Sequence, residues 1–167
     1  MTKLGGTEDW YHILGLSHSK RMWLWLSKKY ATARSADNNL NKYIVFIPQA
    51  SGSGKFGELL GTSIIALPGD TATPTFISIG KFDTLIEAQN AEKYIKTKFS
   101  RALLGVLKIT QHIIPSKWRH VPLQDFTAAS DIDWTKPIPE IDRQLYAKYG
   151  LDENEISFIE KNVKEMK

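Results

Sequence analysis

The residues best suited to chemistry in this 167-residue chain form a glycine-rich segment after a strand-like run. Gly52-Ser53-Gly54-Lys55-Phe56-Gly57 matches G-x-G-x-x-G, the pattern with which dinucleotide folds bind phosphate. That chemistry needs a helix directly after the loop, but only Glu-Leu-Leu separates the last glycine from more strand-like sequence. The segment therefore predicts either a plain inter-strand loop or a loop that approaches a nucleic-acid backbone through its amides, Ser51, Ser53 and Lys55.

A P-loop is the second phosphate-binding pattern to consider for the same segment. Lys55 is followed by Phe56, where a P-loop requires Ser or Thr to reach magnesium, and the upstream glycine spacing is absent. The sequence thus argues against nucleotide binding by this loop.

Metal and thiol chemistry find little support. The chain has no cysteine, which excludes disulfides and thiolate metal ligands and favours a reducing, cytoplasmic location. The histidines are dispersed and show no ligand spacing; they are His12, His18, His112 and His120.

Asp125 and Asp133 are the residues that could belong to a nuclease motif of the P-D…(D/E)-x-K kind. Two residues separate Asp133 from Lys136, where the motif has one, and the Glu-Met-Lys at the end of the chain has the spacing but a terminal position. Turn and capping roles explain these carboxylates more simply.

Aromatic residues lie beside cations at two places. Trp118 stands between Lys117 and Arg119, and Lys20 and Arg21 precede a Trp-Leu-Trp run. Such a composition can contact phosphates and stack on bases. Alternatively, the tryptophans anchor the core while their basic neighbours are solvated.

The distribution of charge is uneven. The net charge is +4, yet residues 1–121 carry 16 basic and 8 acidic side chains, whereas residues 122–167 carry 6 basic and 10 acidic ones. A basic body of this kind suits a polyanionic partner, although a solvated mixed surface explains it as well. The sequence has no apolar run of membrane-spanning length and no signal-peptide pattern, so no membrane partner is expected.

The pattern along the chain predicts an α+β domain in which a small mixed or antiparallel sheet is covered by helices, with a C-terminal helical tail. A single domain over residues 1–167 is expected, with a body at 1–121 and an extended wrap and acidic helical tail at 122–167. Strands are predicted at residues 20–26, 43–47, 63–67 and 75–79, with a turn at Pro68-Gly69-Asp70 between the last two.

Helices are predicted from their caps and periodicity. Asp83 or Thr84 begins the first helix, with Glu87 completing a capping box, and a second helix covers residues 99–109 with Gly105 as its weak point. Residues 115–139, which contain four prolines, are expected to wrap the surface on anchors Trp118, Phe126 and Trp134. Two short helices follow, one from Pro139 to a C-cap at Gly150 and one capped by Asp152 and Glu155.

From about Asn41 onward, the chain resembles the C-terminal region of adenine-specific DNA methyltransferases of type II restriction-modification systems, including fused restriction-and-modification enzymes. The segments that carry the resemblance are Tyr43-Ile44-Val45-Phe46-Ile47-Pro48 with Ala50-Ser51-Gly52-Ser53-Gly54, Thr75-Phe76-Ile77-Ser78-Ile79-Gly80 with Phe82-Asp83, Tyr94-Ile95-Lys96-Thr97-Lys98-Phe99 with Arg101-Ala102-Leu103-Leu104, Trp118 with Val121-Pro122-Leu123-Gln124-Asp125-Phe126-Thr127, and Leu145-Tyr146-Ala147-Lys148-Tyr149-Gly150-Leu151 with Ile156-Ser157-Phe158-Ile159-Glu160.

The resemblance implies a non-catalytic target-recognition module that contacts double-stranded DNA beside a catalytic methyltransferase domain in the parent chain. That domain would bind S-adenosylmethionine and flip the adenine. This chain has no Asn/Asp-Pro-Pro-Tyr/Phe tetrapeptide and no cofactor-binding unit, so no catalytic, cofactor or metal residue is expected in it. Charge and loop position indicate the DNA-contacting candidates, which are Lys20, Arg21, Ser51, Ser53, Lys55, Lys117 and Arg119. The alternative function is a protein-docking scaffold of the same enzyme with little DNA contact.

Overall fold

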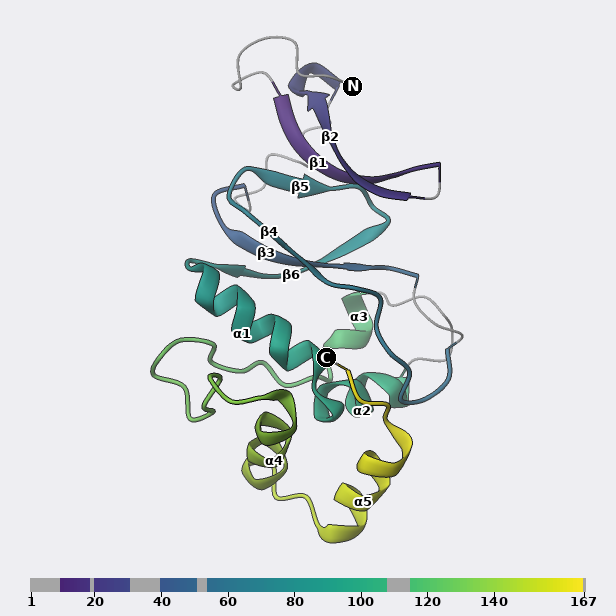
Figure 1. The fold of residues 1–167 in the computed structure, drawn as a ribbon, viewed down its shortest axis with the longest axis vertical. Coiled ribbons are helices and arrows are strands. Elements are labelled where there is room, and N and C mark those ends of the chain that lie inside the picture. The colour runs from purple at the N-terminus through teal and green to yellow at the C-terminus, as the bar shows by residue number, and fades with distance from the viewer. Residues whose placement is uncertain (1–9, 19, 31–39, 51–53, 108–114, 167) are drawn as a thin grey trace.

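The computed structural model describes residues 10–18, 20–30, 40–50, 54–107 and 115–166. It confirms the α+β class: the described strands form two three-stranded sheets, and helices cover one of them and form the C-terminal part (Figure 1). Along the long axis, the hairpin of β1 (Trp10–Ser17) and β2 (Lys20–Ser27) lies at one end, and the second sheet and α1 (Leu85–Lys96) lie in the middle. At the other end lie α4 (Ile138–Lys148) and α5 (Glu153–Asn162).

The first sheet is mixed, with strand order β2-β1-β5. β1 (Trp10–Ser17) and β2 (Lys20–Ser27) pair antiparallel over eight residues, and a short 3-10 turn (Lys28–Tyr30) follows β2. β5 (Asp70–Ala72) pairs parallel to β1. The strand predicted at residues 20–26 is confirmed, whereas β1 and β5 were not predicted.

The second sheet is antiparallel, with strand order β4-β3-β6. Its strands are β3 (Tyr43–Pro48), β4 (Ile64–Ala66) and β6 (Phe76–Phe82), close to the three predicted runs. The turn at Pro68-Gly69 is present, but it leads into β5, which belongs to the first sheet. Between β4 and β6, the chain therefore adds a strand to the first sheet.

β3 separates two hydrophobic cores because its alternate side chains point to opposite faces. Val45 and Ile47 belong to the larger core beneath the helices, while Ile44 and Phe46 belong to a smaller core with Leu14 of β1. All five side chains are at most 3% exposed. β3 thus holds the two sheets together.

α1 (Leu85–Lys96) begins at the predicted N-cap Thr84, whose side chain accepts a hydrogen bond from the Glu87 amide at 3.2 Å. The Glu87 carboxylate reaches back to the amide of Asp83 at 3.2 Å. The face of the helix that carries Ala88, Ala91, Tyr94 and Ile95 is buried. α2 (Lys98–Leu107) follows after Thr97, one residue earlier than predicted; the end predicted at residue 109 lies outside the described residues.

After the undescribed residues 108–114 come α3 (Pro115–Trp118) and an extended wrap, and the acidic C-terminal part continues as α4 (Ile138–Lys148) and α5 (Glu153–Asn162). α5 has the predicted capping box of Asp152 and Glu155, and Gly150 follows α4 with a positive φ of 65°. Of the three predicted anchors, Phe126 and Trp134 are buried, whereas Trp118 is only half-buried.

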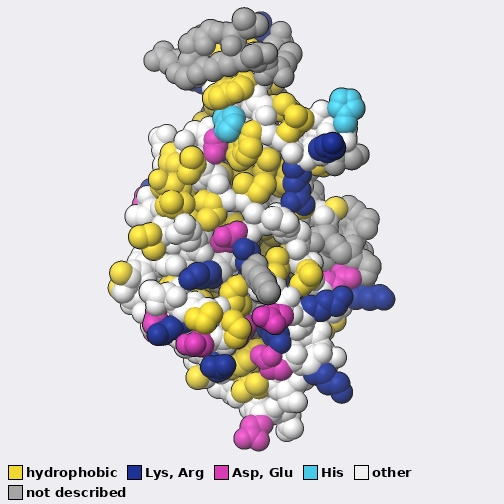
Figure 2. All heavy atoms as spheres, in the orientation of Figure 1, with side chains coloured by type: hydrophobic (Ala, Val, Ile, Leu, Met, Phe, Trp, Pro, Cys, Tyr) yellow, Lys and Arg dark blue, Asp and Glu magenta, His cyan; other side chains and the backbone are white. Residues whose placement is uncertain are grey.

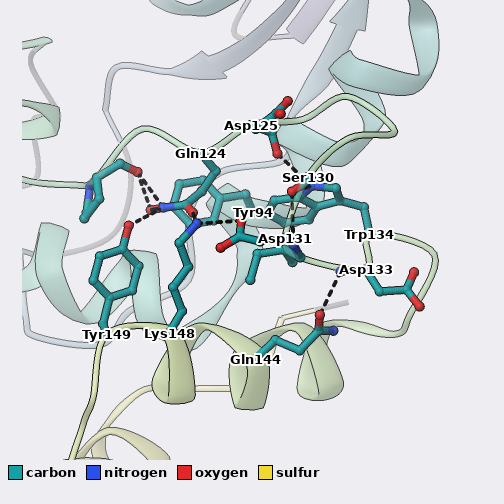
Figure 3. Close-up of polar contacts among 12 residues, drawn as sticks. Tyr94, Gln124, Asp125, Ser130, Asp131, Asp133, Trp134, Gln144, Lys148 and Tyr149 are labelled. Atoms are coloured by element: carbon teal, nitrogen blue, oxygen red, sulfur yellow. Dashed lines mark hydrogen bonds and ion pairs between the residues drawn. The ribbon is translucent and has the colours of Figure 1, made fainter.

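A polar network attaches the wrap to α1 and α4 (Figure 3). The buried Gln124 donates to the Tyr149 hydroxyl at 2.7 Å and accepts from Lys148 Nζ at 2.9 Å. The Trp134 indole donates to the Asp125 carbonyl at 2.9 Å, and the Asp133 amide donates to the Gln144 side chain at 2.7 Å. These hydrogen bonds hold the wrap against α4.

Candidate nucleic-acid interface

Lys20 and Arg21 lie at the start of β2, beside the turn of the hairpin, and both are exposed. Arg21 Nη1 donates to the Thr62 carbonyl at 3.2 Å, and its guanidinium lies 5.9 Å from the Phe76 ring centroid. The hydrogen bond links the hairpin to the segment that precedes β4. Arg21 is therefore partly held by the protein, whereas Lys20 projects from the edge of the sheet.

An aromatic cluster lies on the same face of the first sheet as Arg21, as the pairing register requires. The His12 ring stacks on Trp23 with a centroid separation of 4.4 Å and lies 4.8 Å from Trp25. His12 Nδ1 is 2.7 Å from Asp70 Oδ1, and its side chain is 32% exposed. The cluster explains the Trp-Leu-Trp run, and His12 was not singled out from the sequence because its partners are distant along the chain.

Lys55 is exposed on the loop between β3 and β4, and no helix follows this loop. The absence of a helix directly after the loop is what the short Glu-Leu-Leu spacing predicts. Ser51 and Ser53 lie outside the described residues. Of the three predicted loop contacts, Lys55 is therefore the one whose position is known.

The loop is anchored immediately after Lys55. The Phe56 ring packs on Phe158 at 5.5 Å, and the Gly57 carbonyl accepts from the Lys164 amide at 3.0 Å. Gly57 has a φ of 70°, and a Cβ there would overlap the backbone of α5 at Asn162. These contacts hold the residues that directly follow Lys55 against α5 and the C-terminal segment.

Arg101 of α2 completes this anchor and is 2% exposed. Its Nε donates to the Lys96 carbonyl at 3.1 Å, its Nη1 to the Glu58 carbonyl at 3.3 Å, and its Nη2 to the Lys164 carbonyl. Burial lowers the pKa of Arg101, while the nearby Asp142 carboxylate opposes that shift. Arg101 therefore joins the loop, the α1–α2 junction and the C-terminal segment, and it is not available to DNA.

Lys117 and Arg119 lie at the end of α3 and just after it. Arg119 is exposed and its Nε contacts His120 Nε2 at 2.8 Å, while Lys117 is half-buried. The Trp118 ring lines a cavity beside β6, and its buried Nε1 has no hydrogen-bond partner. Trp118 therefore neither fills the core completely nor lies free on the surface.

The basic candidates thus fall on three segments connected through α2 and the loop before β4. α3 packs against α2, Phe56 of the loop packs on Gly105 of α2, and Arg21 binds Thr62 farther along the same segment. In Figure 1, the hairpin turn and this loop lie along the right-hand edge, where Figure 2 shows several Lys and Arg side chains.

The carboxylates considered for a nuclease have turn roles instead. Asp125 accepts from the Thr127 amide at 2.8 Å, and Asp133 accepts from the Thr135 amide at 3.0 Å. The Thr127 amide lowers the pKa of Asp125. The Thr135 hydroxyl, which donates to Asp133 Oδ1 at 2.5 Å, lowers the pKa of Asp133 together with the Thr135 amide. Among the described residues, no group of three or more His, Asp or Glu side chains is placed to hold a metal.

Comparison with known proteins gave no match: no family model, curated protein or solved structure is similar to this chain at the significance required. Within the described part of the chain, no helix is both long and apolar enough to cross a bilayer.

Proposed function

We propose that this chain is the DNA target-recognition module of an adenine-specific DNA methyltransferase of a restriction-modification system. In this proposal the chain binds double-stranded DNA but performs no catalysis itself. Methyl transfer and S-adenosylmethionine binding belong to a separate catalytic domain of the parent enzyme.

The observation that carries the proposal is the position of the basic residues. Exposed cations occur on the β2 end, the loop before β4 and the segment after α3, three segments that α2 and the loop connect. In the sequence, ten of the eighteen acidic residues lie in the last 46 positions, beyond the segments that carry the candidates. The exposed cations on these three segments are suited to contact phosphates.

The chemistry assigned to these residues follows from their geometry. Lys55 stands on an anchored loop and Lys20 on a strand end, so both suit phosphate contacts that orient the module on DNA. Arg119 has a guanidinium that can bind a guanine edge with two hydrogen bonds, a contact worth about 1–3 kcal/mol. Arg21 is already engaged with Thr62 and Phe76, so we assign it a supporting role.

Titration against duplex DNA tests this proposal. The purified chain is added to a fluorescein-labelled duplex of mixed sequence, and anisotropy is recorded over a series of salt concentrations. We expect Kd to rise steeply with salt, because each neutralised phosphate adds about 0.9 to the logarithmic slope. Lys55→Ala and Arg119→Ala should each weaken binding and reduce that slope by about 1.

Lys161→Ala is the matched control, since Lys161 is an exposed cation on the acidic α5 and should leave DNA binding unchanged. If wild-type protein fails to bind DNA even at low salt, the proposal is wrong and the protein-docking scaffold becomes the preferred function. An equal loss in all three variants would show non-specific attraction and contradict the assignment of Lys55 and Arg119.

A further inference from the structure

β6 lies at an edge of its sheet, since the described strands follow the order β4-β3-β6. Among the described strands, nothing pairs with β6 on the side opposite to β3. An edge strand presents a row of backbone N–H and C=O groups that can pair with another chain. The side of β6 turned away from β3 is therefore a possible site for strand addition.

The ladder between β3 and β6 shows which groups face the open edge. The Gln49 amide donates to the Thr75 carbonyl at 2.9 Å, which makes these two a hydrogen-bonded pair. In an antiparallel ladder such pairs alternate with pairs whose N–H and C=O groups point outward. Counting along the register, the Pro48–Phe76 and Phe46–Ser78 pairs are of the outward kind.

Two observations agree with this count. Pro48 has no N–H to donate, as an outward position allows, and the Phe76 amide instead donates to the Thr73 carbonyl at 3.0 Å. The Phe76 donor is thus occupied within the turn. Ser78, at the middle of β6 and exposed, keeps an outward N–H and C=O at the open edge.

A cavity of about 520 Å³ lies beside this edge. Residues 77–80 of β6 form one wall, and Ala91, Tyr94 and Ile95 of α1 contribute the floor. The opposite wall comes from α3 and the segment after it, including Leu123, which is 89% exposed. The cavity therefore occupies the place of a fourth strand, which would cover α1 and point alternate side chains onto its apolar residues.

The polar groups of the cavity define the chemistry of its ligand. Arg119 is the one Lys, Arg, Asp or Glu side chain on the described lining, while Trp118 contributes its ring, because its Nε1 is buried from solvent. A ligand that brings negative charge would pair with Arg119.

We propose that an extended, acidic peptide segment of a partner protein adds to β6 as a fourth strand. Its backbone pairs with Ser78, its apolar side chains cover α1, and its acidic groups meet Arg119. This inference goes beyond DNA recognition, and because Arg119 is assigned to both ligands, the peptide and DNA would compete for that side chain. The peptide is recognised by main-chain pairing with side-chain selection, the general mode of strand addition.

The test uses the full chain and a fluorescein-labelled hexapeptide of alternating Glu and Val, acetylated and amidated at its ends. Anisotropy measures binding of this peptide, of a Lys-Val counterpart, and of two versions N-methylated on alternate amides in either register. Successive backbone N–H groups of a strand point to opposite sides. We therefore expect methylation in one register to abolish binding and in the other to have little effect, and the Lys-Val peptide to bind at least tenfold more weakly.

Ser78→Pro removes the outward N–H and should be tolerated in an edge strand, whereas Ser78→Ala retains that N–H. We expect Ser78→Pro to weaken peptide binding at least tenfold and Ser78→Ala by less than twofold, with both variants checked for wild-type thermal unfolding.

Three results would overturn the proposal: no binding of the Glu-Val peptide up to about 1 mM, equal binding of both N-methylated registers, or equal binding by Ser78→Pro and Ser78→Ala. If the Lys-Val peptide bound as well as the acidic one, the assignment of an acidic partner would be wrong. A shift of the Ser78 amide resonance on adding peptide, absent on adding the inactive N-methylated version, provides an independent readout of pairing.

Discussion

Asp142 shows how a single residue organises the helical part of the molecule. It lies on α4 and is 2% exposed, and its two carboxylate oxygens accept from the backbone amides of Lys98 and Phe99 at 3.0 and 2.9 Å. It therefore supplies the N-terminal hydrogen bonds of α2 from another helix. Burial raises the pKa of Asp142 to about 6, and the two amides and Arg101 only partly offset this effect.

This pKa predicts a pH dependence of stability. The folded state binds the Asp142 proton more tightly than the unfolded state, so the contribution of this group is present below about pH 4 and is lost as pH rises through about 6. At about 1.4 kcal/mol per pKa unit, the loss amounts to roughly 3 kcal/mol. Asp142→Asn removes this titration but retains an acceptor oxygen.

The measurement is the free energy of unfolding by urea for both proteins at intervals between pH 3.5 and 7 (about the titration range of carboxyl groups). Subtracting the free energy of unfolding of Asp142→Asn from that of wild type cancels the titration of the other carboxylates. We expect this difference to fall with increasing pH. A difference that is flat, or that rises with pH, would contradict a raised pKa at Asp142.

Caps with local partners were predictable at this scale, and caps with distant partners were not. Asp152 and Glu155 are three residues apart and form the predicted capping box, and Thr84 caps α1 as expected. Asp142 lies 44 residues from Lys98, so no spacing in the sequence indicates their hydrogen bond. For the same reason, the sequence grouped Arg101 with a helical run and did not identify it as a buried anchor.

At the scale of elements, Gly105 determines how closely the Lys55 loop approaches α2. Gly105 was predicted to be the weak point of α2, because glycine lowers helix stability. In the structure, a Cβ at this position would lie 2.9 Å from Cδ2 of Phe56, whose ring packs on Phe158. Gly105 therefore allows the loop to approach the helix closely.

This contact predicts the outcome of Gly105→Ala. An alanine in an unobstructed helix interior would add about 1 kcal/mol of stability. Here the Phe56 ring would have to move, so we expect no gain or a loss in the free energy of unfolding by urea. In a Phe56→Ala background the obstruction is absent, and the same change should stabilise the protein; a gain of about 1 kcal/mol in both backgrounds would contradict the proposed contact.

Elements with a strong periodic pattern were predictable, whereas short or partnered ones were not. β3, β6 and α1 bury long apolar faces and lie close to their predicted positions. β5 has three residues and no hydrophobic pattern, and it is a strand because β1 lies beside it. The sequence predicted one sheet, whereas the described strands form two. β3 is apolar on both faces and packs in a core on each side, but the sequence does not show which elements cover its two faces.

At the scale of the whole molecule, the two cores differ greatly in size. Among the described residues, the larger one contains twenty buried residues from the second sheet, the helices and the segments between them, while the smaller one contains five. Of these five, Leu14 comes from the first sheet; the partly buried Trp23 and Ala72 assist it. The first sheet is therefore attached to the rest of the molecule by a small apolar contact.

Leu14→Ala should consequently release the hairpin without unfolding the helical part. Removing a buried leucine costs about 2–5 kcal/mol, and here that loss falls on the contact between the sheets. Because parts of a protein open with their own free energies, we expect amides of β1 and β2 to exchange with deuterium much faster, while those of α1 and α4 change little. Leu145→Ala is the control, since Leu145 is fully buried in the larger core and its loss should accelerate exchange in both regions.

Equal acceleration throughout the Leu14→Ala protein would instead mean that the two sheets and the helices unfold as one cooperative unit. In that case the cations of the hairpin and of the loop would be held in a fixed arrangement, whereas selective release predicts that Lys20 can change position relative to Lys55 in the proposed complex with DNA.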